Sequence, residues 1–373
     1  MSGAYAKAGV NYDDLDPFKR MAQEAARQTV IASGIPHRGE IGWSRGESAY
    51  LYQLSQTEVM GIVHEGIGTR PLVATAMRKI TEKTYGGEIA HSGLATIIND
   101  LATLGVKPNW ITQYIAAGSS EWFADEAYVR DFVNGWRDGC IEAGAIWTVG
   151  ESPALKDVLL PDASDLCGVA VGITHPLNIL DPRGVQNGDV ILLLASSGIH
   201  DNGHSLARKI ASKLPGGYGT SINGRMYGEV LLDPTPFYSH LIPAIQDQLD
   251  VDNRRAVHYA VNITGHGWRK LMRAPQPLEY VIEKAPQPQE VFTFMQGLAE
   301  MSDEDAYGTF NMGAGFALFV SKYHAEDVIH VLGEKGFFPC GLGLVRKSDA
   351  RRVVIHRPGK PDIVYEENSL QLR

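Results

Sequence analysis

Cysteines, an excess of basic residues and long apolar runs are all scarce or missing in this sequence. Its three cysteines (Cys140, Cys167 and Cys340) lie far apart among 373 residues, and none forms a CxxC pair. Because this spacing fits neither a disulfide framework nor a zinc ribbon, we expect a reducing compartment. No apolar run approaches the length of a membrane span, and the first residues lack the apolar core of a secretion signal. The protein is therefore expected to be cytoplasmic, with no membrane partner.

Acidic residues outnumber basic ones, 43 to 34, which gives a formal net charge of -9. A net charge of this sign repels nucleic acids and anionic membranes, so neither is expected as a partner. An anionic ligand would have to be held by local hydrogen-bond donors. Hydrophobic residues make up 44% and charged residues 21% of the chain, a globular composition that excludes a disordered one.

The length and the element pattern predict two α/β domains. Single cores stop growing at roughly 250–300 residues, so a chain of this length is expected to form about two. A proline-bearing connection at 174–182 is the best boundary, which predicts domains at 1–174 and 175–373, with the site in the cleft between them. Periodicity predicts strands at 59–63, 110–116, 146–149, 166–173, 190–195 and 316–320, and helices at 72–83, 89–104, 124–143, 205–213, 238–249 and 288–300.

The clearest single helix signal lies near the N-terminus. Asp16 can cap a helix, Pro17 suits its first helical position, and Gly34 can stop it. These signals predict a helix that begins after Asp16 and ends at Gly34.

A strand, a glycine-containing loop and a helix follow one another over residues 62–71. Gly66 and Gly68 let the backbone approach a ligand, and the free N–H groups of a helix N-terminus favour phosphate. Glu65 could hold a metal ion, and Arg70 could clamp a phosphate oxygen. Glycine spacing alone is equally compatible with an ordinary strand-to-helix turn that carries a surface ion pair.

A second polar loop, at 195–204, again joins a strand to a helix. Asn202 or Ser205 can cap that helix, and the loop's small polar residues suit an anion. His200 and His204 have the spacing of a metal pair, but the Asn-Gly dipeptide between them predicts a turn where a helix would be needed to align both rings. A polar loop with a solvated histidine remains the alternative.

Three carboxylates interrupt apolar patterns at strand or helix positions. Asp100 lies inside an apolar helix, Glu151 directly follows a strand, and Glu65 ends one. Buried carboxylates are costly unless they are paired or bound to a cation, so the three together predict a magnesium site. A helix cap or a buried ion pair is the alternative for each one.

Several stretches match, in order and spacing, the signatures of one known family. They are Tyr5 with Ala8-Gly9-Val10, Glu65-Gly66-Ile67-Gly68-Thr69-Arg70, Asn99-Asp100-Leu101, Gly150-Glu151-Ser152-Pro153, Ser196-Ser197-Gly198 with His200, Asn202-Gly203 and Ser205-Leu206, Ile263-Thr264-Gly265, and Thr309-Phe310-Asn311 with Gly313 and Gly315. On these stretches the sequence resembles the AIR synthetase (phosphoribosylformylglycinamidine cyclo-ligase) family over nearly its whole length.

The resemblance implies a fold and a reaction. The fold is a two-domain α/β (α+β) architecture in which the N-terminal sheets of two subunits join into a barrel-like homodimer core. The reaction uses ATP and Mg²⁺ to close formylglycinamidine ribonucleotide into aminoimidazole ribonucleotide, with release of ADP and phosphate, in purine biosynthesis.

The resemblance also implies roles for individual residues. Catalysis would fall to His200, Glu65 and Arg70. The metal would be held by Glu65, Asp100 and Glu151, and the phosphates of ATP by Gly66, Gly68, Thr69, Arg70 and Asn99. The substrate would contact Ser197, Gly198, His200, Asn202, Ser205, Thr264 and Asn311.

Five positions depart from the family pattern. Glu65 replaces an aspartate and Arg70 a lysine, whereas Ser92 and Ala154 lose a carboxylate and His266 interrupts a run of glycines. The alternative is therefore a diverged paralogue that binds a nucleotide without catalysis or acts on another small phosphorylated substrate. Among related families, thiamine-phosphate kinase stays open, while selenophosphate synthetase and the hydrogenase-maturation relative need cysteines that this chain lacks near its two ends.

Overall fold

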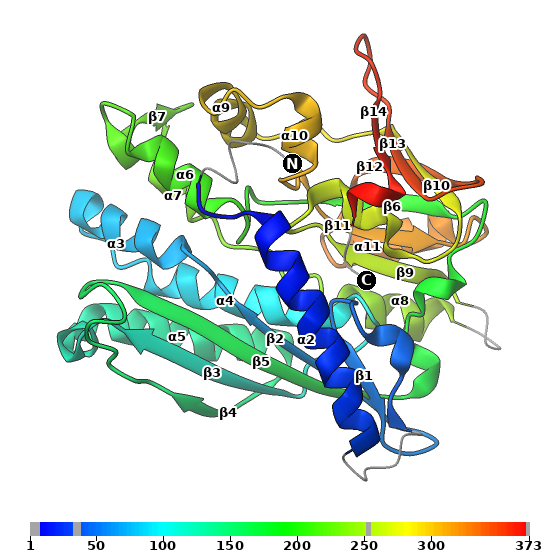
Figure 1. Cartoon of the computed structure of the whole chain (residues 1–373), viewed down its shortest axis with the longest axis horizontal. Coiled ribbons are helices and arrows are strands. Elements are labelled where there is room, and N and C mark those ends of the chain that lie inside the picture. Colours follow the sequence, from blue (N-terminus) through cyan, green and yellow to red (C-terminus); the bar gives the residue numbers. More distant parts are fainter. Residues whose placement is uncertain (1–7, 33–38, 251–254, 371–373) are drawn as a thin grey trace.

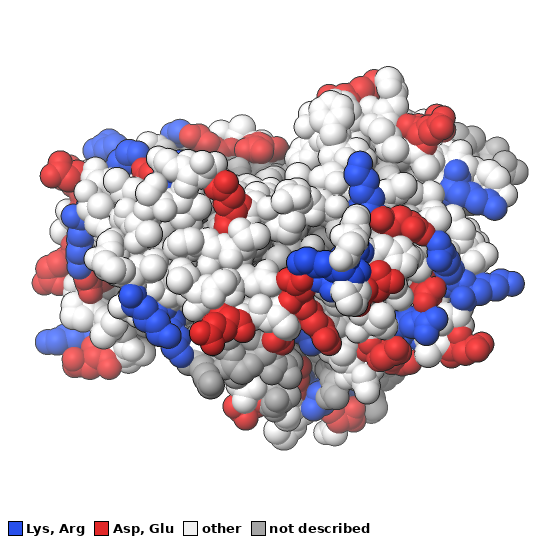
Figure 2. All heavy atoms as spheres, turned by 90° about the horizontal axis from the view of Figure 1, so that it is seen from above, with Lys and Arg blue, Asp and Glu red and all other residues white. Residues whose placement is uncertain are grey.

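The computed structural model describes residues 8–32, 39–250 and 255–370 (Figure 1). It contains two sheets with helices packed against them, which confirms the predicted mixed α/β class. Among the described residues, no helix combines the length and the apolar character needed to cross a membrane. Basic and acidic side chains are interspersed over the face seen in Figure 2.

The first sheet has five strands in the order β1-β2-β5-β3-β4, where only β3 and β4 run parallel. Its strands are β1 (Tyr50–Gln53), β2 (Val59–Gly66), β3 (Trp110–Ala117), β4 (Ile146–Glu151) and β5 (Ser164–Thr174). Alternate residues of β5 are buried, as expected for a sheet covered on one face. The helices of this half are α3 (Arg70–Thr81), α4 (Gly86–Ala102) and α5 (Glu126–Ala143), and Figure 1 shows α4 and α5 against the same face.

The second sheet has seven strands in the order β14-β13-β10-β12-β6-β11-β9. Its strands are β6 (Val190–Ala195), β9 (Val257–Asn262), β10 (Leu278–Lys284), β11 (Ala314–Val320), β12 (Pro339–Lys347), β13 (Arg352–Ile355) and β14 (Ile363–Glu366). Strand β11, which lies next to the edge strand β9, is buried at every position. Around it lie α6 (His204–Ala211), α7 (Tyr227–Leu231), α8 (Leu241–Leu249), α9 (Glu290–Leu298), α10 (Asp303–Tyr307), α11 (Ala325–Glu334) and the 3-10 helix η7 (Gly267–Arg273), with a small ribbon of β7 (Ser221–Ile222) and β8 (Arg225–Met226).

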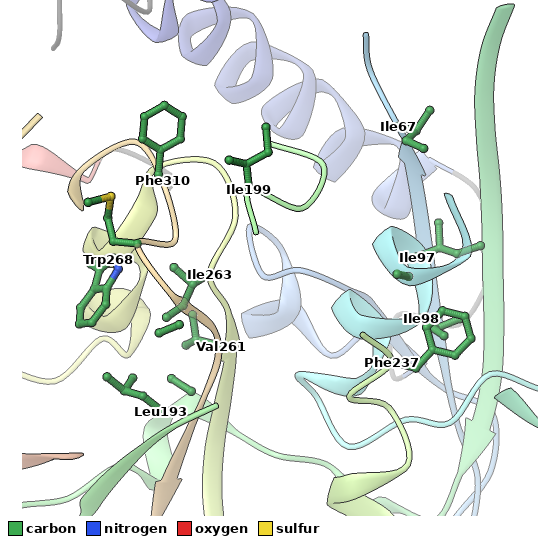
Figure 3. Packing of buried hydrophobic residues seen from close by; sticks show 14 of the residues in the cluster. Ile67, Ile97, Ile98, Leu193, Ile199, Phe237, Val261, Ile263, Trp268 and Phe310 are labelled. Carbon is green, nitrogen blue, oxygen red and sulfur yellow. The ribbon is translucent and has the colours of Figure 1, made fainter. Parts of the chain in front are cut away.

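One continuous hydrophobic core joins the two sheets. Figure 3 shows Ile97 and Ile98 of α4 on one side, and Val261 and Trp268 of the second half on the other, within the same buried cluster. The two sheets lie on either side of residue 175, since β5 ends at Thr174 and β6 begins at Val190. The division into domains at 174/175 stays a prediction.

The N-terminal helix, α2, differs from its prediction. It runs from Tyr12 to Ala32, so it begins before Asp16 and contains Pro17 in its interior. The predicted cap at Asp16 is therefore wrong. Pro17 cannot donate a backbone hydrogen bond, and the helix tolerates the loss of that bond near its start. Gly34, the predicted stop, and Tyr5 lie outside the described residues.

Candidate active site

A cavity of about 290 Å³ lies between the two halves of the chain. β2, α4 and α2 form its first wall, and the second wall comes from the loop after β6, the end of β9 and η7. Its lining residues are Lys19, Glu47, Ser48, Glu65, Gly66, Ala95, Thr96, Asn99, Asp100, His200, Asp201, Asn202, Thr235, Asn262, Thr264, Gly265, His266, Lys270 and Arg273. The sequence predicted a site in the cleft between the two α/β domains, and this cavity is the candidate for it.

Two of the three predicted metal carboxylates meet in the cavity. Glu65 faces it from the end of β2, and Asp100 faces it from α4, where Asn262 Nδ2 donates to Asp100 Oδ1 at 2.8 Å. Although Glu65 is exposed to solvent, desolvation by the surrounding cavity, followed by the negative charge of Asp100, raises the pKa of Glu65 to about 7. Such a pair gains from a bound cation, which would relieve the repulsion between the two carboxylates. Because magnesium is commonly held by one or two carboxylates together with ligand phosphates and water, Glu65 and Asp100 fit it.

The third predicted ligand, Glu151, lies elsewhere. Strand register places Glu65 in a row with Gly168 and Gln113, and Glu151 in the next row, opposite Tyr114. Adjacent positions point to opposite faces of a sheet, and three strand spacings of ~4.8 Å separate β2 from β4, about 14 Å in all. Within one chain the predicted three-carboxylate cluster is therefore wrong, because Glu151 cannot share an ion with Glu65.

Arg70 is not placed to clamp a ligand phosphate. Its side chain is 0% exposed and is absent from the cavity lining. The guanidinium pairs with Asp201 at 2.8 Å and donates to the Asp233 carbonyl at 2.7 Å. Arg70 thus joins the start of α3 to two loops of the second half. The predicted phosphate contact needs a correction, since the guanidinium is fully buried and both of its Nη atoms already bond protein groups, which leaves only a buried Nε without a partner among the described residues.

The glycine loop before α3 touches the second polar loop. Thr69 Oγ1 and Ser205 Oγ lie 3.4 Å apart, and Gly68 adopts a φ of 65°, which favours glycine. Of this segment only Glu65 and Gly66 line the cavity, whereas Gly68, Thr69 and Ser205 lie outside the lining. The two predicted loops therefore lie close together, but only some residues of each loop line the cavity.

Several residues that were predicted to contact ligands instead form hydrogen bonds to the backbone around the cavity. Asn99 lines the cavity, but its amide donates to the Pro236 carbonyl and accepts from the Tyr238 N–H, both at 2.8 Å. Asn311 donates to the Gly198 carbonyl at 2.8 Å, and Ser197 Oγ donates to the Pro234 carbonyl at 2.7 Å. Of the predicted substrate residues, the cavity lining includes His200, Asn202 and Thr264.

His200 is a neutral imidazole in this structure. It is 3% exposed, and burial, with a smaller effect from Arg70, lowers its pKa to about 3. Its Nε2 accepts the Ser197 N–H at 3.2 Å, while His204 Nε2 contacts the His200 carbonyl at 2.8 Å. The two rings are therefore not arranged as a metal pair, in agreement with the turn predicted between them. The described residues contain no cluster of three or more metal-ligating side chains.

The sequence reasoning missed the cations of the cavity. Lys19 comes from α2, and Lys270 and Arg273 come from η7. The sequence held no local signal for the last two, because η7 is kinked at Met272 and the cavity that they line is formed by distant segments.

Comparisons with known proteins agree with this architecture. Residues 46–174 match the family model described as AIR synthase related protein, N-terminal domain. A phosphoribosylformylglycinamidine cyclo-ligase from Pseudothermotoga lettingae is 32% identical over 340 residues, which cover 90% of this chain and 95% of that protein.

Two solved structures share the fold at low sequence identity. A chain of the HypE–HypF complex aligns with a TM-score of 0.62 and 15% identity, covering 92% of this chain and 99% of that one. T. maritima PurL, complexed with ATP, aligns with a TM-score of 0.54 and 12% identity, covering 90% of this chain and 49% of that one. Given the identity to the Pseudothermotoga lettingae protein over nearly the full length of both chains, this chain belongs to the phosphoribosylformylglycinamidine cyclo-ligase (AIR synthetase) family, whose members are C–N bond-forming ligases.

Proposed function

We propose that the protein cyclises formylglycinamidine ribonucleotide to aminoimidazole ribonucleotide with consumption of ATP. The observation that carries this proposal is that Glu65 and Asp100 share one cavity with His200 and Asn202 of the second loop. Carboxylates suited to a metal–phosphate complex thus face a polar loop suited to a substrate. The three cysteines are free thiols, which favours a reducing cytoplasm as the site of the reaction.

The reaction has two balanced steps. The formyl-amide oxygen first attacks the terminal phosphoryl group of ATP, and the bond from that phosphorus to ADP breaks. An amidine nitrogen then attacks the formyl carbon, a C–N bond forms, and the C–O bond to the phosphate breaks. ADP, phosphate and one proton leave. Catalysis of this kind depends on positioning, charge neutralisation and exclusion of water.

Glu65 and Asp100 are the residues that would hold Mg²⁺, which would neutralise phosphate charge when bound. Asn202 is fixed by its donation to the Thr309 carbonyl at 2.6 Å, so the loop is held at a defined position in the wall. His200 stays uncharged at neutral pH, so its contribution is to shape and polarity and not to positive charge.

The alternative of a non-catalytic nucleotide-binding subunit has less support from the geometry. The two positions that lost a carboxylate, Ser92 and Ala154, are absent from the cavity lining. Ser92 is fully buried and lies 3.4 Å from the Thr235 N–H, whereas Ala154 bridges to Ala117. Glu65, which replaces the family's aspartate, and Asp100 both supply a carboxylate to the cavity.

Incubation of the protein with ATP, Mg²⁺ and formylglycinamidine ribonucleotide tests the proposal. ADP and the imidazole product should appear in equal amounts. Formation of ADP together with a phosphorylated, uncyclised substrate would indicate a kinase instead, and binding of ATP with no ADP formed would indicate the non-catalytic subunit.

His200→Ala should lower turnover by about tenfold or more, because a buried contact of the substrate loop is lost. Magnesium affinity, measured by titration, should stay at the parent value, since His200 is no metal ligand here. His330→Ala, on the exposed side of α11, is the matched control. A parallel loss of metal affinity in His200→Ala would show that the histidine belongs to the metal site.

The uncovered face of the first sheet supports the proposed homodimer. Ile62, Val171, Trp110 and Ile146 form one row across this face, and all four are half-buried or exposed. β4 ends the sheet, and no described strand pairs with its outer edge. An apolar face beside an open edge favours association with a second copy.

Light scattering at micromolar concentration should therefore give the mass of a dimer. Ile146→Glu should shift it towards the monomer, because Ile146 is 62% exposed in the single chain and the charge would be buried in the pair. Leu298→Glu, on the distant helix α9, should leave the mass unchanged. A monomeric parent protein would contradict the dimer.

A further inference from the structure

A buried ammonium group faces the cavity from the second half of the chain. Lys270 of η7 is 6% exposed, and its Nζ donates to the Thr264 hydroxyl and, at 3.3 Å, to the Asn262 carbonyl. An ammonium has three N–H donors, so one is left after these two bonds. The described residues offer this nitrogen no direct ion pair.

A second cation, Arg273, lies three residues further along η7, after a kink at Met272. Arg273 Nη1 donates to Ser48 Oγ at 2.8 Å and lies 4.0 Å from Glu47 Oε2, so its charge is partly balanced. Its Nε is buried and has no hydrogen-bond partner among the described residues. Lys270 and Arg273 line the same cavity, and the charge of Arg273 acts on Lys270.

This arrangement is unfavourable without a ligand. Burial, together with the positive charge of Arg273, lowers the pKa of Lys270 to about 8. Asp100 and Glu65 attract the ammonium from the opposite wall, but neither forms a direct ion pair with it. A buried charge without a direct partner costs stability, and a second charge of the same sign adds to that cost. An anion between Lys270 and Arg273 would remove both penalties.

We propose that Lys270 and Arg273 form an anion subsite that binds a phosphoryl group of a ligand in the cavity. A compact ammonium beside a planar guanidinium supplies converging donors to phosphate oxygens, and the Thr264 hydroxyl lies within the same group. The subsite rests on the proposed function, whose two reactants, a nucleoside triphosphate and a sugar phosphate, both carry this chemistry. Glu65 and Asp100 on the other wall would then face the phosphate across a metal ion.

Lys270→Met tests the subsite, because it keeps most of the side-chain volume and removes the charge. Calorimetric titration with pyrophosphate and with ribose 5-phosphate should show the affinity for at least one of them falling about tenfold or more, as expected for a lost charged hydrogen bond. The melting temperature of the ligand-free variant should be unchanged or higher, since an unpaired buried charge is gone. Lys270→Arg should retain much of the affinity, and Lys322→Met, at an exposed position, all of it.

The ligand that is affected identifies the source of the phosphoryl group. A loss for pyrophosphate assigns the subsite to the nucleotide, and a loss for ribose 5-phosphate assigns it to the sugar phosphate. If Lys270 were only a counter-ion for Glu65 and Asp100, Lys270→Met would melt at a lower temperature and bind both probes as the parent does, which would overturn the proposal. A parent protein that binds neither probe would overturn it as well.

The binding assay also separates this inference from the proposed function. If Lys270→Met loses phosphate affinity but the parent protein forms no imidazole product, the subsite is supported and the proposed cyclisation is contradicted. If Lys270→Met shows the turnover and the phosphate affinity of the parent, the subsite is contradicted and the proposed cyclisation is not.

Discussion

Replacement of Glu65 by glutamine should lower ATP-dependent turnover on the order of a hundredfold or more, because the change removes a carboxylate charge that faces a metal–phosphate complex. Glutamine preserves the size of the side chain, so the cavity keeps its shape. Glu65→Asp should retain much more activity than Glu65→Gln, since a water can bridge the missing methylene to a magnesium ion that keeps part of its water shell. Initial rates over a magnesium titration provide the measurement.

Glu58→Gln is the matched control for this change. Glu58 precedes β2 in the same hairpin, is exposed, and bonds only locally, to Ser55 Oγ at 3.2 Å. It should turn over at the parent rate. Should Glu65→Gln also form ADP and product at the parent rate at every magnesium concentration, Glu65 would be a structural loop residue.

Replacement of Arg70 by methionine should lower the free energy of unfolding by about 3–5 kcal/mol, because it leaves the Asp201 carboxylate buried without its cation. The guanidinium also bonds the Asp233 carbonyl and connects α3 to the second half of the chain. Urea unfolding followed by tryptophan fluorescence provides the measurement. The second variant, Arg70→Met with Asp201→Asn, should recover part of the loss, since no unpaired charge remains.

Arg78→Met is the matched control for Arg70→Met. Arg78 lies on the same helix, α3, and pairs with Asp125, but both side chains are about a third exposed. Its replacement should cost about 1 kcal/mol or less. If Arg70→Met unfolded like the parent but lost its affinity for phosphate ligands, the role first inferred from the motif, as a phosphate clamp, would be right.

Long periodic elements could be predicted from the sequence, and short strands could not. The apolar pattern of 190–195 is that of a buried strand and agrees with β6, and the pattern of 124–143 agrees with α5 to within two residues. β13 and β14 have four residues each and no pattern of their own. β13 is stabilised by pairing with β10, and β14 by pairing with β13; the first of these is a long-range interaction that local periodicity does not contain.

The segments that form the site could be predicted from the sequence, but the directions in which their side chains point could not. Glu65 and Asp100 were inferred from local chemistry and His200 from the family resemblance, and all three line one cavity. The face on which Glu151 lies depends on strand order and on an irregularity between Ile111 and Gln113 in the pairing of β3 with β4. Neither feature is visible in the sequence near Glu151, which is why its assignment failed.

Arg70 shows the same limit for a charged side chain. Its place at the start of a helix after a glycine loop suggested a phosphate contact. The structure turns the side chain into the protein, where Asp201, far away in sequence, supplies the partner. Lys270 and Arg273 are the converse case, because their role depends on the cavity that two distant segments form around them.

The fate of the formyl oxygen shows whether ATP activates it before the ring closes. Formylglycinamidine ribonucleotide that carries ¹⁸O in its formyl group would be converted with ATP and Mg²⁺, and the released phosphate analysed by mass spectrometry. Because ATP is proposed to activate that oxygen, each phosphate released should carry one ¹⁸O atom and should appear together with one ADP and one imidazole product. Unlabelled phosphate, or ADP formed without the imidazole product, would contradict the proposed reaction.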